Sequence, residues 1–171
     1  NSNSNSISDN ESIGHTVSSD FEIKIDSTSS VYLNPSFSKN ISKNKYKSNS
    51  RTTDANNLDL NENEIDNFND SENNSFKNNL YYTKEFKRKG RRLSFAFDVE
   101  SNSYENKLFT VNNTTFFQTG NPDEERNQYR KNKNNSNDLD FQFSYSEPIL
   151  DSISLGIDLN FRHKNNNDFQ E

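Results

Sequence analysis

The stretch LDFQFSYSEPILDSISLGIDLNF, residues 139–161, decides the fold of this chain. Apolar and polar residues alternate before Glu147-Pro148, and the same alternation resumes after it from Ile153. Successive side chains of a β-strand point to opposite faces, so each half has one apolar and one polar face. A short segment containing Pro and Ser joins the two halves, and this arrangement predicts a β-hairpin.

The composition is unusually polar for an ordered chain. Only 27% of the 171 residues are hydrophobic, the net charge is -6, and 32 Asn and 25 Ser make up one third of the chain. Such polarity first suggests disorder, because little apolar surface offsets the loss of chain entropy. The 14 Phe and 7 Tyr, however, cluster at alternating positions. This clustering predicts ordered strands.

Several classes of protein are disfavoured by the same composition. No run approaches the roughly 18 to 20 apolar residues of a transmembrane helix, and we expect any signal peptide to be absent or already removed. The absence of Cys excludes disulfides and thiolate metal sites. The acidic balance argues against a nucleic-acid partner. Apolar faces occur on strands but hardly at helical spacing, which leaves no obvious second layer for a soluble core.

The alternating pattern recurs along the chain and predicts three hairpins. Their short turns lie near 26–29, 87–90 and 146–152, and long polar regions separate the hairpins. Asp54–Glu72 is predicted to be a long loop, and Tyr104–Gln118 either extends strands or forms a small loop hairpin. The predicted organisation is a flexible polar segment at 1–16, β-hairpins over 17–165 and a polar tail at 166–171. The predicted strands lie near 17–25, 30–46, 74–86, 91–104, 132–146 and 152–164.

Short turns on one side and long loops on the other are typical of outer-membrane barrels. In hydrocarbon every backbone N–H and C=O must be paired internally, so strands survive there only in a closed sheet. The fold class predicted is therefore all-β, a segment of an antiparallel up-and-down transmembrane β-barrel with about six strands. Asp98, Glu100, Asp140 and Asp158 all fall on the polar parity, which would face a wet interior.

The apolar parity provides the candidate lipid-facing residues. Pro35 lies on this parity but cannot donate to a ladder, so we expect it near a strand start, at a bulge. Phe86 and Tyr145 beside the turns suit an aromatic girdle, and the cations from Lys84 to Arg92 suit anionic headgroups or a solvated turn. The predicted lipid-facing residues are Phe21, Ile23, Val31, Leu33, Phe37, Leu80, Tyr82, Leu93, Phe95, Phe97, Leu139, Phe141, Phe143, Ile153, Leu155, Ile157, Leu159 and Phe161.

Four segments carry a resemblance to a known family. They are EFKRKGRRLSFAFDVESNSYEN at 85–106, RNQYRKNKNN at 126–135, FSYSEPILDSISLGIDLNFRHKNNN at 143–167 and KIDSTSSVYLNPSFSKN at 24–40. These segments resemble the outer-membrane β-barrel domain of TonB-dependent receptor-like proteins of Bacteroidota. The resemblance extends over most of 17–165, and its motifs, a K-K-G-R-type turn and a Y-x-E-P-[IL] turn, are structural.

The resemblance implies nutrient uptake across the bacterial outer membrane. Its expected partners are outer-membrane lipid, the rest of the barrel, a plug domain and an inner-membrane energy-coupling protein. The chain departs from the family in having no visible plug or energy-coupling box and no aromatic last residue. Closure needs about eight strands or more, so we expect a fragment of a larger barrel.

No pattern predicts an enzyme, a metal site or a cofactor. His15 and His163 stand alone in polar surroundings, and Asp98 with Glu100, or Asp123–Glu125, match no calcium loop. Two alternatives to the transport segment stay open. One is a complete small eight-stranded barrel in which 104–118 supplies another hairpin, and the other is a secreted, soluble, adhesin-like β-domain.

Overall fold

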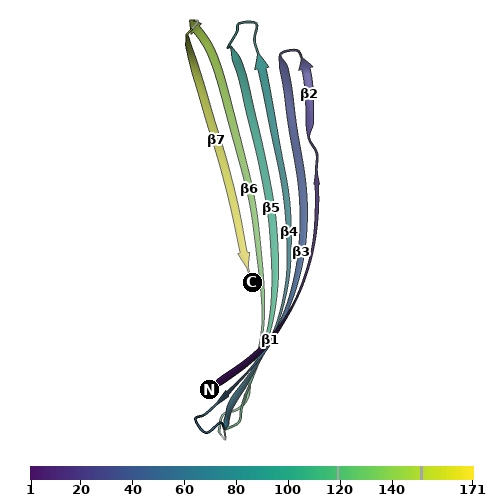
Figure 1. The fold of residues 1–171 in the computed structure, drawn as a ribbon, viewed down its shortest axis with the longest axis vertical. Coiled ribbons are helices and arrows are strands. Elements are labelled where there is room, and N and C mark those ends of the chain that lie inside the picture. Colours follow the sequence, from purple (N-terminus) through teal and green to yellow (C-terminus); the bar gives the residue numbers. More distant parts are fainter. Residues whose placement is uncertain (119, 151) are drawn as a thin grey trace.

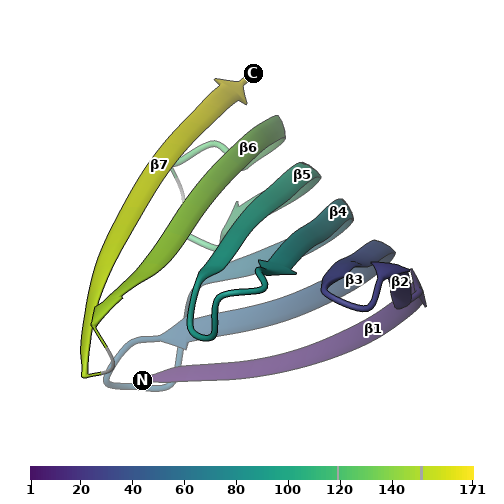
Figure 2. The same ribbon diagram turned by 90° about the horizontal axis from the view of Figure 1, so that it is seen from above.

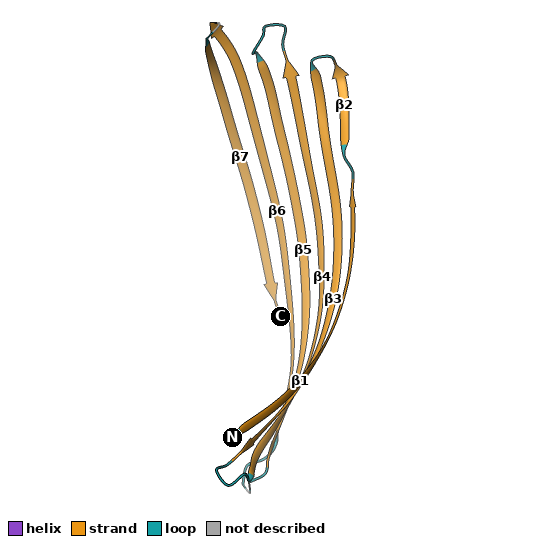
Figure 3. Ribbon diagram, viewed as in Figure 1, coloured by secondary structure: helices purple, strands orange, loops and turns teal. Residues whose placement is uncertain are grey.

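The computed structural model describes residues 1–118, 120–150 and 152–171, and they form a single seven-stranded antiparallel sheet (Figure 1). The strand order is β1-β3-β4-β5-β6-β7, and β2 pairs with β3 beside β1. No helix occurs among these residues, so none is long and apolar enough to span a membrane (Figure 3). The strands are β1 Ser2–Ser18, β2 Phe21–Asp26, β3 Ser29–Thr53, β4 Asp59–Glu85, β5 Arg92–Phe116, β6 Glu124–Leu150 and β7 Ile153–Gln170.

The sheet is a long, curved and open wall. Seen from above, the strands lie along an arc with β1 and β2 at one edge and β7 at the other (Figure 2). The central strands have 25 to 27 residues, which at about 3.3 Å per residue makes them roughly 80–90 Å long. The all-β antiparallel expectation is confirmed. The sheet does not close on itself within the described residues.

The described residues contain no hydrophobic core. Every described apolar side chain is partly or fully accessible, and only Ser29 is buried, at 4% exposure. Soluble domains instead bury an apolar face between packed layers, which is the dominant favourable contribution to folding in water. The apolar face of this sheet has no second layer from the described chain.

The strands extend much further than the alternating pattern predicted. The predicted flexible segment at 1–16 lies almost wholly in β1, and the predicted tail at 166–171 lies in β7 up to Gln170. Only Asp54–Leu58 is a turn in the predicted loop Asp54–Glu72, because β4 begins at Asp59. The predictions of long loops and of six strands are therefore wrong.

The ambiguous segment from Tyr104 to Gln118 is also resolved. It continues β5 as a single strand to Phe116 and does not form a separate hairpin. Its backbone pairs with β4 on one side and β6 on the other, so its hydrogen bonds need no apolar face to hold them. Period-2 alternation disappears there because each face carries a mixture of apolar and polar side chains, although the ladder continues.

Pro35 lies inside β3 without the predicted bulge. Its carbonyl oxygen accepts a hydrogen bond from the Ser19 N–H at 3.0 Å, so the backbone of Pro35 faces the gap between β1 and β2. A residue's N–H and C=O point to the same neighbouring strand, and the missing donor of Pro35 therefore faces that gap. The ladder between β3 and β4 continues without a shift past Asn78, the partner of Pro35.

Gly90 gives a stability prediction at the turn between β4 and β5. Its φ of +87° lies in the left-handed region, whereas the Cβ of an alanine would meet Pro148 at an ordinary 3.7 Å. We expect Gly90→Ala to cost about 1–2 kcal/mol, from backbone strain alone. Urea unfolding in detergent micelles measures this cost.

Gly156 is the matched control for that substitution. An added Cβ at Gly156 in β7 has open space, with nothing within 4 Å. Gly156→Ala should therefore be neutral or slightly stabilising, since alanine has less backbone freedom to lose than glycine. Equal losses at both positions would contradict the strain explanation.

Candidate membrane-facing surface

The strand register collects apolar side chains from distant segments into two rows on one face. Directly paired residues of neighbouring strands place their side chains on the same side of a sheet, so each row can be followed from strand to strand. One row is Phe21, Leu33, Leu80, Phe97, Phe141 and Phe161. The next is Ile23, Val31, Tyr82, Phe95, Phe143 and Leu159.

The other predicted lipid-facing residues lie on this same face, to either side of the two rows. They are Phe37, Leu93, Leu139, Ile153, Leu155 and Ile157. Together with the two rows they form a continuous surface, which we call the apolar band. The structure thus brings together residues that the sequence could assign only strand by strand. Their contact with lipid stays a prediction.

The apolar band is exposed and about as tall as a membrane requires. The Phe97 side chain is 38% exposed and the Phe161 side chain 65%. Neighbouring rings of the band also contact each other, as Tyr82 and Phe95 do with centroids 5.1 Å apart. On β7 the band runs over residues 153–161, roughly 30 Å along the strand and about 21 Å at a tilt near 45°. Barrel proteins present an apolar band of about 25 Å.

The opposite face is mostly polar at the alternate positions, and it carries like charges side by side. Asp98 pairs with Asp140, and Glu100 pairs with Asp138, across β5 and β6. Directly opposed like charges destabilise a sheet unless counter-charges or water offset them. Lys77 approaches Glu100 at 3.1 Å, and Arg162 donates to Asp138 at 2.6 Å.

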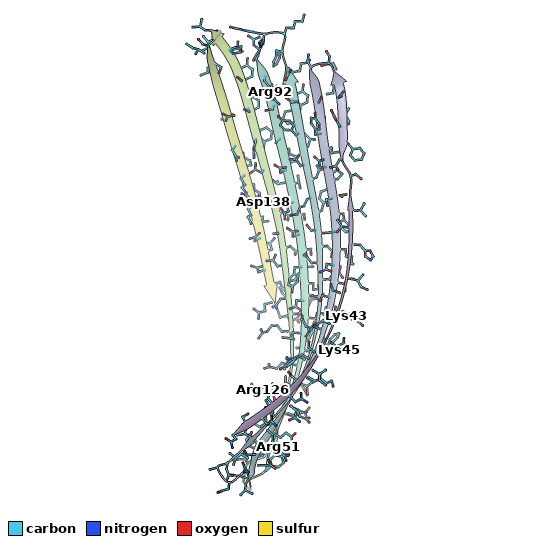
Figure 4. The ribbon with its side chains drawn as sticks, viewed as in Figure 1. Lys43, Lys45, Arg51, Arg92, Arg126 and Asp138 are labelled. Atoms are coloured by element: carbon cyan, nitrogen blue, oxygen red, sulfur yellow. The ribbon has the colours of Figure 1, made fainter. Side chains whose placement is uncertain are left out.

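A hollow of about 420 Å³ lies over these carboxylates on the polar face. Asp138, one of the residues that line it, is labelled in Figure 4. The Asn79 amide donates to Asp98, and the Gln142 amide donates to Asp140 at 3.1 Å. In the described chain, these four carboxylates are therefore bonded to side-chain amides and to two cations, Lys77 and Arg162. Such a surface is stable only against water, which makes the two faces of the sheet suited to different solvents.

The short-turn border of the apolar band carries an ionic cluster that joins two hairpins. Arg91 donates to both carboxylate oxygens of Glu147, at 2.6 and 2.7 Å, and Arg88 donates to Oε1 at 3.1 Å. The Tyr145 hydroxyl donates to Oε2 at 2.5 Å. Hydrogen bonds from Arg91 and Tyr145 lower the pKa of Glu147 to about 2.

This cluster predicts an acid-sensitive contact. The folded pKa of Glu147 is depressed, so its contribution is complete above the unfolded value near 4.3 and is lost as pH falls toward about 2. We expect Glu147→Gln to lower the urea midpoint at pH 6 and to flatten its pH dependence between about 4.5 and 2. Glu85→Gln, at the end of β4 and without an ion pair in the described chain, is the control. An unchanged pH profile in Glu147→Gln would contradict this role.

The first short turn has a comparable network around Asp26. Its carboxylate accepts hydrogen bonds from the hydroxyl and N–H of Thr28 at 2.7 Å each, and from Lys84 at 3.1 Å. These donors, Thr28 first, hold the pKa of Asp26 well below its ordinary value. The predicted basic cluster therefore contributes Lys84, Arg88 and Arg91 to ion pairs within the sheet.

Beyond the apolar band, ion pairs link β3 and β4. Lys39 meets Glu72 at 2.8 Å, and Lys47 meets Asp66 at 2.7 Å. Near the far turn, Arg51 meets Asp59 at 2.8 Å. The sequence analysis assigned Asp54–Glu72 to a loop, whereas the structure pairs its acidic residues with basic residues of β3. The signal that could have found this hairpin is their opposite charge, arranged symmetrically about the turn at Asp54–Leu58.

The remaining polar candidates are scattered. His15 pairs with Lys39 on β1 and β3, and His163 pairs with Leu139 on β7 and β6. Asp123 accepts a hydrogen bond from the Phe116 N–H at 3.0 Å, which closes the β5–β6 connection. Over the described ranges, no group of three or more His, Cys, Asp or Glu is arranged to hold a metal ion.

These features define the class of protein as all-β, with a single antiparallel sheet that has an apolar band on one face and polar side chains on the other. No family model matches the chain, and no curated protein matches it. Among solved structures the chain is similar to the RagAB peptide importer in its open-open state, with a TM-score of 0.51 and 13% identity.

That alignment covers 94% of this chain but only 18% of the importer chain. At this identity the similarity shows the fold alone. A membrane pore complex of pneumolysin matches at a TM-score of 0.13 and 9% identity, covering 79% of this chain and 31% of that one, and it carries no argument.

Proposed function

We propose that this chain forms part of the wall of a bacterial outer-membrane β-barrel, in a TonB-dependent receptor-like protein that imports a nutrient. The observation that carries the proposal is the pair of apolar rows crossing six strands, with polar side chains at the alternate positions. In a membrane barrel the apolar rows would face lipid, and the polar side chains would face a water-filled interior. The role proposed is non-catalytic.

The open edges of the sheet support a wall that further strands complete. A strand edge in hydrocarbon would leave backbone groups unpaired at a cost of several kcal/mol each. β1, β2 and β7 present such edges, and the chain spans only 18% of the similar importer chain. The partners in this proposal are outer-membrane lipid, the rest of the barrel, a plug domain and an inner-membrane energy-coupling protein, the last two by family resemblance.

The two alternative functions have less support. A complete eight-stranded barrel needed 104–118 to supply an extra hairpin, whereas 104–116 continues β5. A secreted soluble β-domain needs a layer over the apolar face, and the described chain supplies none. The outer-membrane wall is the function that uses both faces.

Alternate labelling along one strand tests the proposal. The chain itself has no Cys, so a cysteine placed at Phe97 or at its neighbour Ala96 is the single label site once any cysteine elsewhere in the full-length protein is replaced. With an environment-sensitive fluorophore attached in the full-length protein, we expect lipid-borne quenchers to act at 97 and aqueous quenchers to act at 96. The pair Phe143 and Gln142 repeats the comparison on β6.

Two outcomes would overturn the wall assignment. One is equal aqueous quenching at all four positions, and the other is a protein that is monomeric and folded without detergent. Import itself is tested by uptake in cells lacking the gene. Peptides are the first cargo class to try, since the similar structure is a peptide importer.

A further inference from the structure

Three aromatic rings form a separate row in the polar half of the sheet that lies away from the short turns, which we call the outer half. Phe68, Phe109 and Tyr129 are direct cross-strand partners on β4, β5 and β6. Their ring centroids are 6.3 Å apart for Phe68–Phe109 and 4.7 Å apart for Phe109–Tyr129. Phe109 and Tyr129 are 45% and 47% exposed. We call these three residues the ring row.

The ring row adjoins a hollow with charged walls. The hollow measures about 310 Å³ and is lined by Phe68 together with Asp9, Glu11, Lys43 and Lys45. Lys43 and Lys45 make no ion pair with the described residues, and Figure 4 shows them on β3 in the outer half of the sheet. The end of the ring row at Phe68 therefore meets free ammonium groups and carboxylates, while Phe109 and Tyr129 continue the row beside the hollow.

The ring row shares a face with the apolar band but lies well beyond it. Along β5, Phe109 follows Val99, the cross-strand partner of the band residue Leu139, by ten residues without a bulge. The row therefore lies on the apolar side about 30 Å further along the strand. A molecule that touches it from the membrane must carry a long headgroup. A compact phosphate headgroup would end near the border of the band.

We propose that the ring row and its hollow bind the saccharide headgroup of a glycolipid in the surrounding outer leaflet. Sugar rings stack their C–H faces on aromatic rings, and their hydroxyls bond to carboxylates and ammonium groups. An exposed aromatic cluster within a polar surface is typical of an interaction site, and the charged walls of the adjoining hollow favour a hydroxylated ligand. The inference rests on the proposed membrane location, because only that location aligns a glycolipid with this face.

A purely structural role for the rings makes a different prediction. Cross-strand aromatic pairs stabilise a sheet by about 0.2–1 kcal/mol each, whether or not a ligand is present. Leucine keeps most of the apolar contact but lacks the flat ring face. Phe109→Leu with Tyr129→Leu therefore removes stacking while it preserves much of the ladder. Phe116→Leu, on the opposite face of β5, is the matched control.

The test compares two glycolipid probes on the full-length protein in detergent. One is lipopolysaccharide with its core oligosaccharide, and the other is lipid A without it. We expect the wild type to bind the first about tenfold more tightly, as stacking on two rings allows, and the double variant to lose that preference. The Phe116→Leu control should keep it, and thermal unfolding should show all three proteins folded.

Each other outcome has its own meaning. Equal binding of both probes by the wild type, or an unchanged preference in the double variant, would overturn the saccharide site. So would ring substitutions that weaken association with another protein and leave glycolipid binding intact. Failure of the proposed function itself would appear separately, as loss of the alternating quenching at 96 and 97.

Discussion

Phe141→Arg should prevent most of the protein from folding into bilayers. Phe141 lies in the middle of an apolar row, between Phe97 on β5 and Phe161 on β7. An arginine on the lipid face at mid-height costs about 2–4 kcal/mol, because hydrocarbon cannot solvate its charge. The measurement is the folded fraction in lipid vesicles across a urea series.

Gln142→Arg is the control for this substitution. Gln142 is adjacent on β6 and faces the polar side, where Asp140 is near enough to share a hydrogen bond of 3.1 Å. Water and a carboxylate both solvate an arginine there, so we expect a change within about 0.5 kcal/mol. Equal losses for the two variants would mean that the two faces of β6 do not meet different solvents.

Ala96→Pro should also abolish folding, through the backbone rather than the side chain. Ala96 pairs with Tyr81 on β4 and with Gln142 on β6, so its N–H lies within a complete ladder. Proline removes this donor and leaves an acceptor unpaired, which costs roughly 2–7 kcal/mol in a medium without water. The same vesicle assay measures the loss.

Pro35→Ala provides the comparison for that prediction. Pro35 already lacks a donor, but on the side facing the gap at Ser19. Because Ser19 already bonds to residue 35 and lies opposite it, the Ser19 carbonyl can accept the restored N–H, and we expect a change within about 0.5 kcal/mol. A large loss at Pro35, or wild-type folding of Ala96→Pro, would contradict the ladder described for β3 and β5.

The apolar band could be predicted from the chain alone because its signal is local. Leu139 to Tyr145 alternate with polar residues, and each such stretch reveals its two faces without any knowledge of its partners. The predicted lipid-facing residues therefore all fall on one face. The ends of the strands could not be predicted from alternation. β3 continues to Thr53 and β4 begins at Asp59, through residues that are polar on both faces.

The amino-acid sequence by itself determined which side chains share a face, since alternation follows from the geometry of a single strand. Only the tertiary structure decided how the strands align, and with that the ring row and the Arg91–Glu147 contact. Cross-strand partners such as Phe109 and Tyr129 are twenty residues apart in the chain and become neighbours only through the register. Register depends on the pairing of whole strands, which no local pattern records.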